Sequence, residues 1–261
     1  MRNYSSRFRL PNGKWAYIQF KGLAGDANRH MRRIRGFWNP PDHFFHFQKG
    51  GHVAALRQHQ GRAWYGKIDL SRFFNHVTRH RVTRCLKRLG YSFRDAEEFA
   101  VASTVCVDHK EWRFALPYGF VQSPLLASIA FDLSELGNCC RRLNSGNCAV
   151  SIYVDDIVIS GDTKAEVEAA LSEMHQAARM SNFAINTAKS RAASTALQAF
   201  NIDFDAHEMN ISNERFDEMG RDVMFSGAGQ VSDGILGYVR SVNPRQADQL
   251  LRNFPRAFAR E

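Results

Sequence analysis

The sequence predicts a mixed α+β protein, and three observations support this class. Segments typical of strands alternate along the chain with segments whose apolar residues have helical spacing, and no internal repeat is visible. Of the 261 residues, 44% are hydrophobic, which is enough for a sizeable core and excludes a disordered chain. The 18 Gly and 7 Pro are scattered, which excludes a collagenous or low-complexity chain. This length allows one large domain or two modest ones.

The balance of charges favours a polyanionic partner. The chain carries 35 Lys and Arg against 26 Asp and Glu, a formal net charge of +9. This charge favours nucleic acid over a membrane surface as the partner. No apolar stretch reaches the roughly 18 residues that a membrane span needs. The N-terminus does not resemble a secretory signal, and the five cysteines include no C-x-x-C pair. We therefore expect a cytoplasmic protein without a membrane span, a disulfide framework or a structural zinc site.

The first 36 residues are basic and aromatic. They hold nine Lys and Arg against the single acid Asp26, interleaved with five aromatic residues. Such a surface can contact phosphates and stack on bases, and the alternative is a solubilising edge of an ordinary domain. Residues 8–21 are typical of a β-hairpin with its turn at residues 11–13, and Pro40 with Pro41 ends any regular element.

The middle of the chain begins with a strand, predicted over residues 63–70. Thr78 is typical of a helix N-cap, and the apolar residues after it keep helical spacing up to Gly90. Ser92 starts a second predicted helix, which runs through Cys106.

The second half continues this alternation. Ser123 with Pro124 predicts a helix to about Leu143, and two β-rich runs fill residues 150–160. The remaining predicted elements are a helix with a capping box from Thr163 to about Met180, strands over residues 192–211 and a last helix from Asn243. Strands give way to helices near residue 213, which is the plausible domain boundary.

Two adjacent carboxylates stand between the β-rich runs of residues 150–160. Asp155 and Asp156 follow Tyr153 and Val154, where an ordinary hairpin would have Asn-Gly or Asp-Gly. Asp has a low strand propensity, and two carboxylates about 4 Å apart repel each other by roughly 1 kcal/mol in water and about 4 kcal/mol near a protein surface. The pair is a poor choice for stability unless divalent cations neutralise it.

A third carboxylate, Asp69, ends the predicted strand over residues 63–70. If this strand lies beside the hairpin of residues 150–160, three carboxylates converge at one edge of the sheet. Such a cluster can hold two Mg²⁺ ions about 3.5–4 Å apart, the arrangement for in-line phosphoryl transfer. One ion lowers the pKa of an attacking 3′-hydroxyl, and the other stabilises the leaving pyrophosphate.

Residues 116–124 lie between these acids in the sequence. Gly119 lets the backbone approach a ligand closely, and Ser123 with Pro124 begins a helix whose N-terminal amides attract anions. The alternative is a simple turn before a buried helix. The segment indicates a ligand-binding site only in combination with the acids.

In this order, the motifs resemble the palm motifs of reverse transcriptases. They are Asp69 with Phe73 and Phe74, the Leu-Pro-x-Gly-x-x-x-Ser-Pro segment of residues 116–124, and Tyr-Val-Asp-Asp at residues 153–156. The similarity is closest to bacterial enzymes of the retron and group II intron kind, and to compact solitary enzymes associated with phage defence. It covers about residues 45–250 and is highly specific from 67 to 190, where residues 185–191 also match, with looser matches at residues 47–51, 200–204 and 235–244.

The resemblance implies a right-hand polymerase fold with fingers, a palm with an antiparallel sheet and a small helical thumb. The fingers would take residues 1–62, the palm residues 63–212 with part of the fingers inserted at about 91–115, and the reduced thumb residues 213–261. The implied activity is that of an RNA-directed DNA polymerase, which adds dNTPs to a 3′-hydroxyl. Its template would be a dedicated non-coding RNA in a bacterial phage-defence or retroelement setting.

The resemblance also assigns catalytic roles at matching positions. Asp69, Asp155 and Asp156 would be the metal-binding carboxylates, and the Leu70 carbonyl would be a further ligand. Lys189 would act as a general acid that protonates the departing pyrophosphate. The implied cofactor is a pair of Mg²⁺ ions, with Mn²⁺ as a substitute.

A second set of residues would bind the dNTP. Arg72 and Phe73 would present backbone amides to the triphosphate, and Phe74 would exclude a 2′-hydroxyl and so favour dNTPs over rNTPs. Tyr118 stands where the family usually has Gln, and its ring would stack on the incoming nucleotide or on the template base. Gly119 follows it in the same segment.

Other basic residues and the histidines give weaker signals. The candidates for contact with nucleic acid or the triphosphate are Lys14, Arg32, Arg33, Arg35 and Lys49. His76 and His80 have the i, i+4 spacing of a metal pair, but no further ligand stands at a diagnostic spacing, so we assign them no site.

The expected partners are an RNA template, a DNA or RNA primer and dNTPs. Because 261 residues is short within this family, we expect a structured RNA, a second copy of the chain or an accessory protein to provide some of the contacts that hold the template. One alternative is template-independent or protein-primed DNA synthesis, with the candidate priming residues Tyr4, Tyr65, Tyr91 and Tyr238. The alternative from another class is a catalytically silent RNA-binding scaffold, against which the three retained acids argue.

Overall fold

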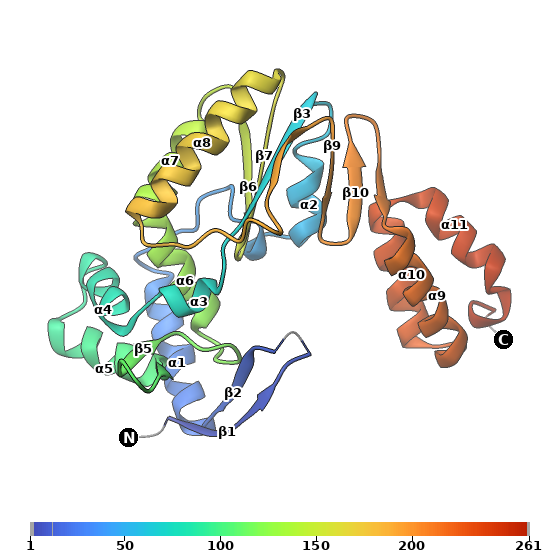
Figure 1. Ribbon diagram of the computed structural model, residues 1–261. Coiled ribbons are helices and arrows are strands. Elements are labelled where there is room, and N and C mark those ends of the chain that lie inside the picture. The colour runs from blue at the N-terminus through green and yellow to red at the C-terminus, as the bar shows by residue number, and fades with distance from the viewer. Residues whose placement is uncertain (1–2, 12, 260–261) are drawn as a thin grey trace.

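The computed structural model describes residues 3–11 and 13–259 and has a mixed α+β architecture, as predicted (Figure 1). The helices are α1 (Lys21–Ile34), α2 (Gly51–Arg57), α3 (Phe73–His76), α4 (Arg79–Arg88), α5 (Phe93–Ser103), α6 (Ser123–Asp132), α7 (Glu135–Asn144), α8 (Lys164–Met180), α9 (Asn213–Ser226), α10 (Gln230–Val242) and α11 (Pro244–Asn253). The strands are β1 (Tyr4–Arg9), β2 (Trp15–Gln19), β3 (Trp64–Asp69), β4 (Val105–Asp108), β5 (Arg113–Ala115), β6 (Ala149–Tyr153), β7 (Asp156–Gly161), β8 (Arg191–Ser194), β9 (Ala196–Ala199), β10 (Ile202–Asp205) and β11 (Met209–Ile211). No helix within the described ranges is long and apolar enough to cross a membrane.

The central sheet carries the predicted acids and has the strand order β6-β7-β3-β8, with antiparallel pairing. β-Branched residues form β7, and residues 157–159 are almost fully buried, as expected for a strand that is covered on both faces. Helix α8 packs on one face and approaches Gly66 closely, since a Cβ atom there would lie 2.8 Å from a methyl group of Leu171. The register pairs Asp69 with Asp156, so the strand pairing fixes the relative position of these two residues.

The β1–β2 hairpin lies on the same side of the molecule as α1 and contacts the segment before α6 (Figure 1). Ala16 forms a bridge with Tyr118, and the Tyr17 amide donates to the Tyr118 carbonyl at 2.8 Å. The two strands confirm the hairpin predicted over residues 8–21, while its turn residue Asn12 lies outside the described residues.

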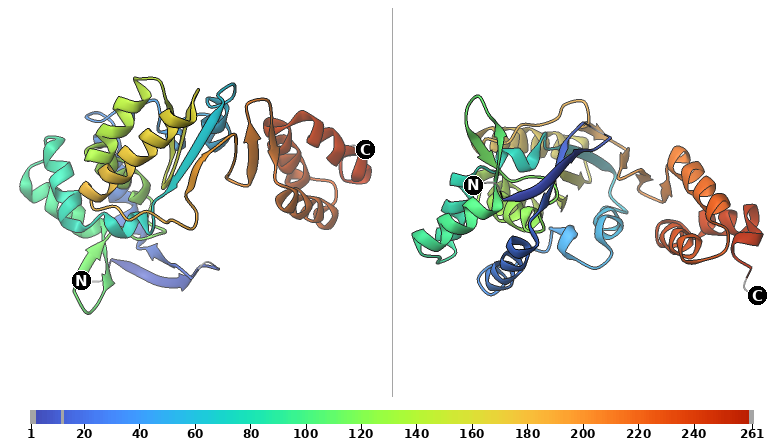
Figure 2. Two further views of the ribbon diagram at one scale, coloured as in Figure 1. Left: turned by 45° about the horizontal axis from the view of Figure 1, so that its top comes forward. Right: turned by 90° about the horizontal axis from the view of Figure 1, so that it is seen from below.

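The C-terminal helices belong to a second apolar cluster. Helices α9, α10 and α11 pack with the sheet of β9, β10 and β11 through Met219, Val223, Val239, Ala247 and Leu250. In two orientations these helices lie at the end of the molecule remote from α4 and α5 (Figures 1 and 2). Strands give way to helices at Asn213, where the boundary was expected, and the division into fingers, palm and thumb stays a prediction.

Two predicted helices are wrong in extent. The helix from Ser92 ends before Cys106, which lies in β4 and pairs with β5. The helix predicted over residues 123–143 is two helices, because Ser134 accepts a hydrogen bond from the Gly137 amide and caps a new helix, α7. A serine N-cap here interrupts an apolar pattern that would otherwise continue.

Candidate active site

The turn between β6 and β7, residues 153–156, is called the acid turn below. Tyr153 pairs with Asp156, and Val154 has a left-handed backbone with a φ of 60°, which β-branched residues rarely adopt. The Leu70 amide donates to the Asp155 carbonyl at 2.9 Å and ties the turn to the end of β3. Backbone contacts therefore hold the acid turn against the strand that ends at Asp69.

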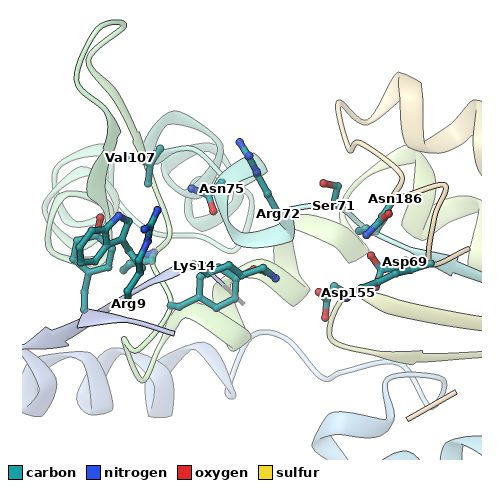
Figure 3. Close-up of a pocket in the computed structure, with 16 residues that line it drawn as sticks. Arg9, Lys14, Asp69, Ser71, Arg72, Asn75, Val107, Asp155 and Asn186 are labelled. Carbon is teal, nitrogen blue, oxygen red and sulfur yellow. Dashed lines mark hydrogen bonds between the residues drawn. The ribbon is translucent and has the colours of Figure 1, made fainter. Parts of the chain in front are cut away.

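The side chains of Asp69 and Asp155 lie next to each other in one cavity (Figure 3). Burial raises the pKa of Asp155 to about 6, and the neighbouring charges of Asp156 and Asp69 act in the same direction. Ionisation of such a carboxyl costs free energy unless a cation is close. Carboxylate oxygens are the donors that a hard divalent cation prefers, and Leu70 lines the cavity beside them.

Asp156 has a partner that the sequence did not reveal. Its carboxylate forms an ion pair with Lys67 of β3 at 2.7 Å, and the two side chains are only 19% and 11% exposed. The Lys67 ammonium also lies 5.7 Å from the centre of the Phe200 ring, in the turn between β9 and β10. Asp69 and Asp155 line the cavity, but Asp156 does not. Two of the three predicted carboxylates thus share the cavity, and the third is neutralised beside it.

The cavity has a volume of about 490 Å³ and lies between the acid turn and the β1–β2 hairpin. Its two ends differ in charge: Asp69 and Asp155 lie at one end, and Arg9, Lys14 and Arg72 lie toward the other (Figure 3). The cavity is also lined by Ser71, Asn75, Tyr118, Asn186 and Lys189. This separation of charge suits a ligand with a polyanionic part and a part that is held through a cation.

Lys14 and Tyr118 join the hairpin to the segment before α6. The Lys14 ammonium donates to the Tyr118 hydroxyl at 2.9 Å and lies 4.8 Å from the centre of its ring. Burial lowers the pKa of Lys14, but the hydrogen bond to Tyr118 and the charges of Asp155 and Asp69 outweigh this effect, so the pKa is raised. Lys14 therefore stays protonated in the cavity.

The close approach that we predicted at Gly119 is to the protein's own backbone. Gly119 has a φ of +99°, and a Cβ atom there would lie 2.4 Å from the Tyr17 carbonyl oxygen. Gly119 does not line the cavity. The missing side chain thus allows the contact between β2 and this segment, and a contact of Gly119 with the dNTP stays a prediction.

The loop before β8 brings Lys189 to the cavity. The Asn186 amide donates to the Asp69 carbonyl at 2.8 Å, and the Lys189 amide donates to the Asn186 carbonyl at 3.2 Å. The Ser190 hydroxyl accepts from the Asp69 amide at 3.1 Å. Because both backbone groups of Asp69 bind this loop, Lys189 is held at the same site as the acids.

The residues after Asp69 divide between the cavity and the core. Arg72 lines the cavity and has a left-handed backbone with a φ of 47° at the start of α3. Phe73 and Phe74 are 2% and 8% exposed, and neither lines the cavity. The Phe74 ring lies 4.9 Å from the ring of Tyr118, which does line it.

Of the five basic residues expected to bind nucleic acid or the triphosphate, Lys14 lines the cavity. The other four are exposed and lie at the C-terminal end of α1 or in the turn before α2: Arg32, Arg33, Arg35 and Lys49. None of these four residues lines the cavity.

The sequence did not single out Arg9, Trp15 or His46. Arg9 and Trp15 line the cavity, and the basic and aromatic composition of the first 36 residues was the available signal. His46 Nδ1 accepts from the Val154 amide at 3.2 Å, and its Nε2 lies 2.7 Å from Ser128 Oγ. Burial lowers the pKa of His46 to about 4, so the neutral ring can accept this bond and support the acid turn.

The central sheet, the acid turn and the C-terminal helices are arranged as in polymerases of the right-hand class. Within that class, residues 12–222 match the family described as reverse transcriptase (RNA-dependent DNA polymerase), and the chain belongs to this family. This match confirms the family resemblance of the sequence motifs.

Two solved structures agree with this fold. The telomerase of Candida albicans, in complex with a TWJ fragment of telomeric RNA, has a TM-score of 0.56 at 10% identity, over 90% of this chain and 46% of that chain. A foamy viral protease-reverse transcriptase, in complex with an RNA/DNA hybrid, has a TM-score of 0.54 at 13% identity, over 98% of this chain and 33% of that chain. These likenesses confirm the right-hand fold, and the chain spans less than half the length of either protein. A search of curated proteins gives no match.

Proposed function

We propose that the protein is an RNA-directed DNA polymerase that adds dNTPs to a 3′-hydroxyl. The observation that carries this proposal is the cavity, which has Asp69 and Asp155 at one end and Arg9, Lys14 and Arg72 toward the other. Membership of the reverse transcriptase family supports it, as do similar folds that bind RNA or an RNA/DNA hybrid.

The donor set at the acid end fits Mg²⁺, with Mn²⁺ as a substitute. Within residues 3–11 and 13–259, no three His, Cys, Asp or Glu side chains are grouped so that they could hold a metal. We therefore assign the first coordination to Asp69, Asp155 and the Leu70 carbonyl, with Asp156 joining once Lys67 releases it. Two bound Mg²⁺ ions would lower the pKa of the attacking hydroxyl and stabilise charge on the leaving pyrophosphate.

The remaining residues of the cavity bind and orient the nucleotide. Lys14 and Arg9 contact the triphosphate, and the backbone amides of Arg72 and Phe73 add hydrogen-bond donors. Lys189 gives a proton to the pyrophosphate oxygen as the P–O bond breaks. Because each group lies on an element tied to β3 or on the hairpin, and both line one cavity, they can contact the same nucleotide.

Primer extension tests this function. Purified protein with Mg²⁺, labelled dNTPs and a primed RNA should extend the primer, and the Asp155→Ala/Asp156→Ala variant should not. If the wild-type protein gives no Mg²⁺-dependent product, even with co-purified cellular RNA, the polymerase proposal is wrong. Product without any template would instead indicate template-independent or protein-primed synthesis.

Sugar discrimination tests the role of Phe74. The Phe74→Ala variant should lower the preference for dNTPs over rNTPs, on the order of 10–100-fold, because the ring that packs 4.9 Å from Tyr118, in the wall of the cavity, is lost. Phe73→Ala is the matched control, since it removes the same ring from a core position that is 2% exposed. Equal discrimination in wild type and Phe74→Ala would remove the assignment.

The structure bears on the two alternatives. Among the tyrosines considered as primers, Tyr65 and Tyr91 are buried, and the Tyr238 hydroxyl lies 3.1 Å from His52 Nε2. A silent scaffold would gain nothing from Asp155, whose burial makes its ionised form costly. Templated synthesis with a nucleic-acid primer is therefore the function that the site supports best.

The biological setting rests on the sequence motifs. We infer that the template is a dedicated non-coding RNA in a bacterial phage-defence or retroelement context. We also infer that the protein acts in the cytoplasm and has a second copy or an accessory protein as its partner. Sequencing of the RNA that co-purifies with the protein tests this inference. One enriched, structured RNA is the expected result, and an unselective sample of cellular RNA would contradict it.

A further inference from the structure

We propose that helix α4 forms a second RNA-binding surface, outside the catalytic cavity, that takes a single-stranded segment. Half of its ten residues are Lys or Arg and none is acidic: Arg79, Arg81, Arg84, Lys87 and Arg88. Its buried residues, Val82, Thr83, Cys85 and Leu86, anchor one face in the core. The cations therefore occupy the faces of α4 that remain.

These five cations have no carboxylate partners. None of them forms an ion pair within the part of the chain that the structure describes, whereas Arg142 of α7 pairs with Glu173, and Lys164 of α8 pairs with Glu168 at 3.4 Å. Like charges that stay without counter-charges attract a polyanion, because its binding releases condensed counterions. Arg79 also donates to the Thr104 hydroxyl at 2.9 Å, but within the described residues no carboxylate cancels these charges, which are therefore available to phosphates.

One side of α4 borders a cavity of about 470 Å³ that suits phosphate groups. Arg81, Arg84 and Arg88 line it, with Glu135 as the single carboxylate. Arg81 and Arg88 donate to main-chain carbonyls of neighbouring helix ends at 2.8–3.2 Å, which fixes their orientation. A guanidinium has five N–H donors, so both residues keep donors for a ligand, and Arg84 is exposed.

The other side of α4 borders a cavity of about 340 Å³ that is partly aromatic. The Arg79 guanidinium lies 3.9 Å from the centre of the Phe114 ring, and Glu97 is the single carboxylate of this cavity. Phe93 is 60% exposed, with the Lys87 ammonium 5.6 Å from its ring. The exposed Phe93 ring next to cations matches single-stranded RNA, whose bases stack while its phosphates contact the cations, better than it matches an acidic protein.

This surface is separate from the catalytic cavity. Neighbouring residues of α3 face different cavities: Asn75 lines the catalytic cavity, and His76 lines the cavity of Arg84. Helices α4 and α5 lie at the end of the molecule away from α9, α10 and α11 (Figures 1 and 2). RNA can therefore be held on α4 while the catalytic cavity is filled.

The inference rests on the proposed function only for the identity of the polyanion. Fluorescence anisotropy with the full chain and a labelled, unstructured RNA of about 20 nucleotides measures the affinity. The variant Arg84→Glu/Lys87→Glu, at two exposed positions, should weaken binding at least about tenfold and reduce the slope of log K against log salt by about 1.4, or about 0.7 per lost phosphate contact. Arg142→Glu/Lys164→Glu changes the net charge equally and should keep the affinity within about twofold.

A second variant and a competitor distinguish RNA from protein. Phe93→Ala should weaken RNA binding roughly five- to tenfold without changing the salt slope, because it removes stacking and no charge. Unaltered affinity of Arg84→Glu/Lys87→Glu would overturn the proposal. So would polyglutamate that displaces the labelled RNA as readily as unlabelled RNA does, since the surface would then select acidic protein.

Primer extension separates this proposal from the proposed function. On a short primed template that is too small to reach α4, the Arg84→Glu/Lys87→Glu variant should extend like wild type. The Asp155→Ala/Asp156→Ala variant should lose extension and keep its RNA affinity. If wild type failed to extend while the α4 variant still lost RNA binding, the polymerase proposal alone would fall.

Discussion

The two ends of the catalytic cavity are built in different ways. At the acid end, strand register pairs Asp69 with Asp156, and the Leu70 amide ties the acid turn to β3. At the basic end, the β1–β2 hairpin packs on other elements: Tyr17 lies in a small apolar cluster with Val105 and Phe120, and Tyr118 joins the hairpin through one bridge and the Lys14 hydrogen bond. The acid end is therefore part of one sheet, while the basic end is assembled from separate elements, so we expect the first to govern the chemical step and the second to govern nucleotide binding.

The largest effect is expected at the acid end. Asp155→Asn should lower kcat by about 10³-fold or more, because an amide cannot supply the charge that holds the cations, and this loss amounts to several kcal/mol. Steady-state primer extension measures it. Asp162→Asn, an exposed carboxylate at the other end of β7, is the control and should leave kcat unchanged. Comparable activity in the two variants would contradict the assignment.

The pH dependence of stability should also originate at the acid end. Burial raises the pKa of Asp155 to about 6 in the folded protein, so folding binds a proton between about pH 4 and pH 6. The cost of ionising buried Asp155 lowers the free energy of unfolding. This cost is absent below that pH window and complete above it, where it is on the order of 3 kcal/mol. In EDTA, the Tm of wild type should fall by several degrees relative to Asp155→Asn as the pH rises from 5 to 7.5. Parallel Tm curves would show that Asp155 does not titrate in this window.

A smaller effect, of another kind, is expected at the basic end. Lys14→Met should raise the KM for dNTPs about tenfold with kcat within about threefold, because a charged hydrogen bond to the triphosphate is lost. Lys21→Met, an exposed lysine at the start of α1, should change neither constant. A fall in kcat at constant KM would erase the distinction between the two ends.

The smallest effect concerns the residue that neutralises Asp156. Lys67→Met leaves that carboxylate without its partner, which should lower the stability in EDTA by about 1 kcal/mol and tighten Mn²⁺ binding roughly fivefold. The midpoint of the Tm increase during a Mn²⁺ titration measures the affinity without reference to activity. Lys67→Arg keeps the ion pair and should behave like wild type. Weaker Mn²⁺ binding by Lys67→Met would mean that Lys67 positions the acids rather than competes for them.

The acid end was the more predictable of the two. Its strands follow from β-branched runs, and a two-residue turn leaves little choice of register between β6 and β7, so this hairpin could be expected. The partner of Asp156 could not, because Lys67 is one of many lysines until packing against Phe200 selects its position. The supporting role of His46 depends in the same way on residues that are far apart in the sequence.

The basic end could be predicted only as a composition. The contact that positions the hairpin joins Tyr17 to Gly119, about a hundred residues apart, and no local pattern reports it. Residues 21–34 were not predicted as a helix at all, since Gly22 and Gly25 weaken the helical pattern and few of their side chains are buried. Which of the N-terminal basic residues reached the cavity was therefore decided by tertiary contacts.

The pairing of β3 with β7 also determines where the chain can change in length. Because side chains alternate between faces, inserting or deleting one residue within β3 or β7 would turn Asp69 or Asp156 to the helix-covered face of the sheet. The turn between β4 and β5 has no such constraint, and Trp112 within it is 71% exposed. Related chains should therefore vary in length at the turn between β4 and β5 and keep a constant length between residues 64 and 69. A reporter peptide inserted into the turn between β4 and β5 would leave the catalytic register intact.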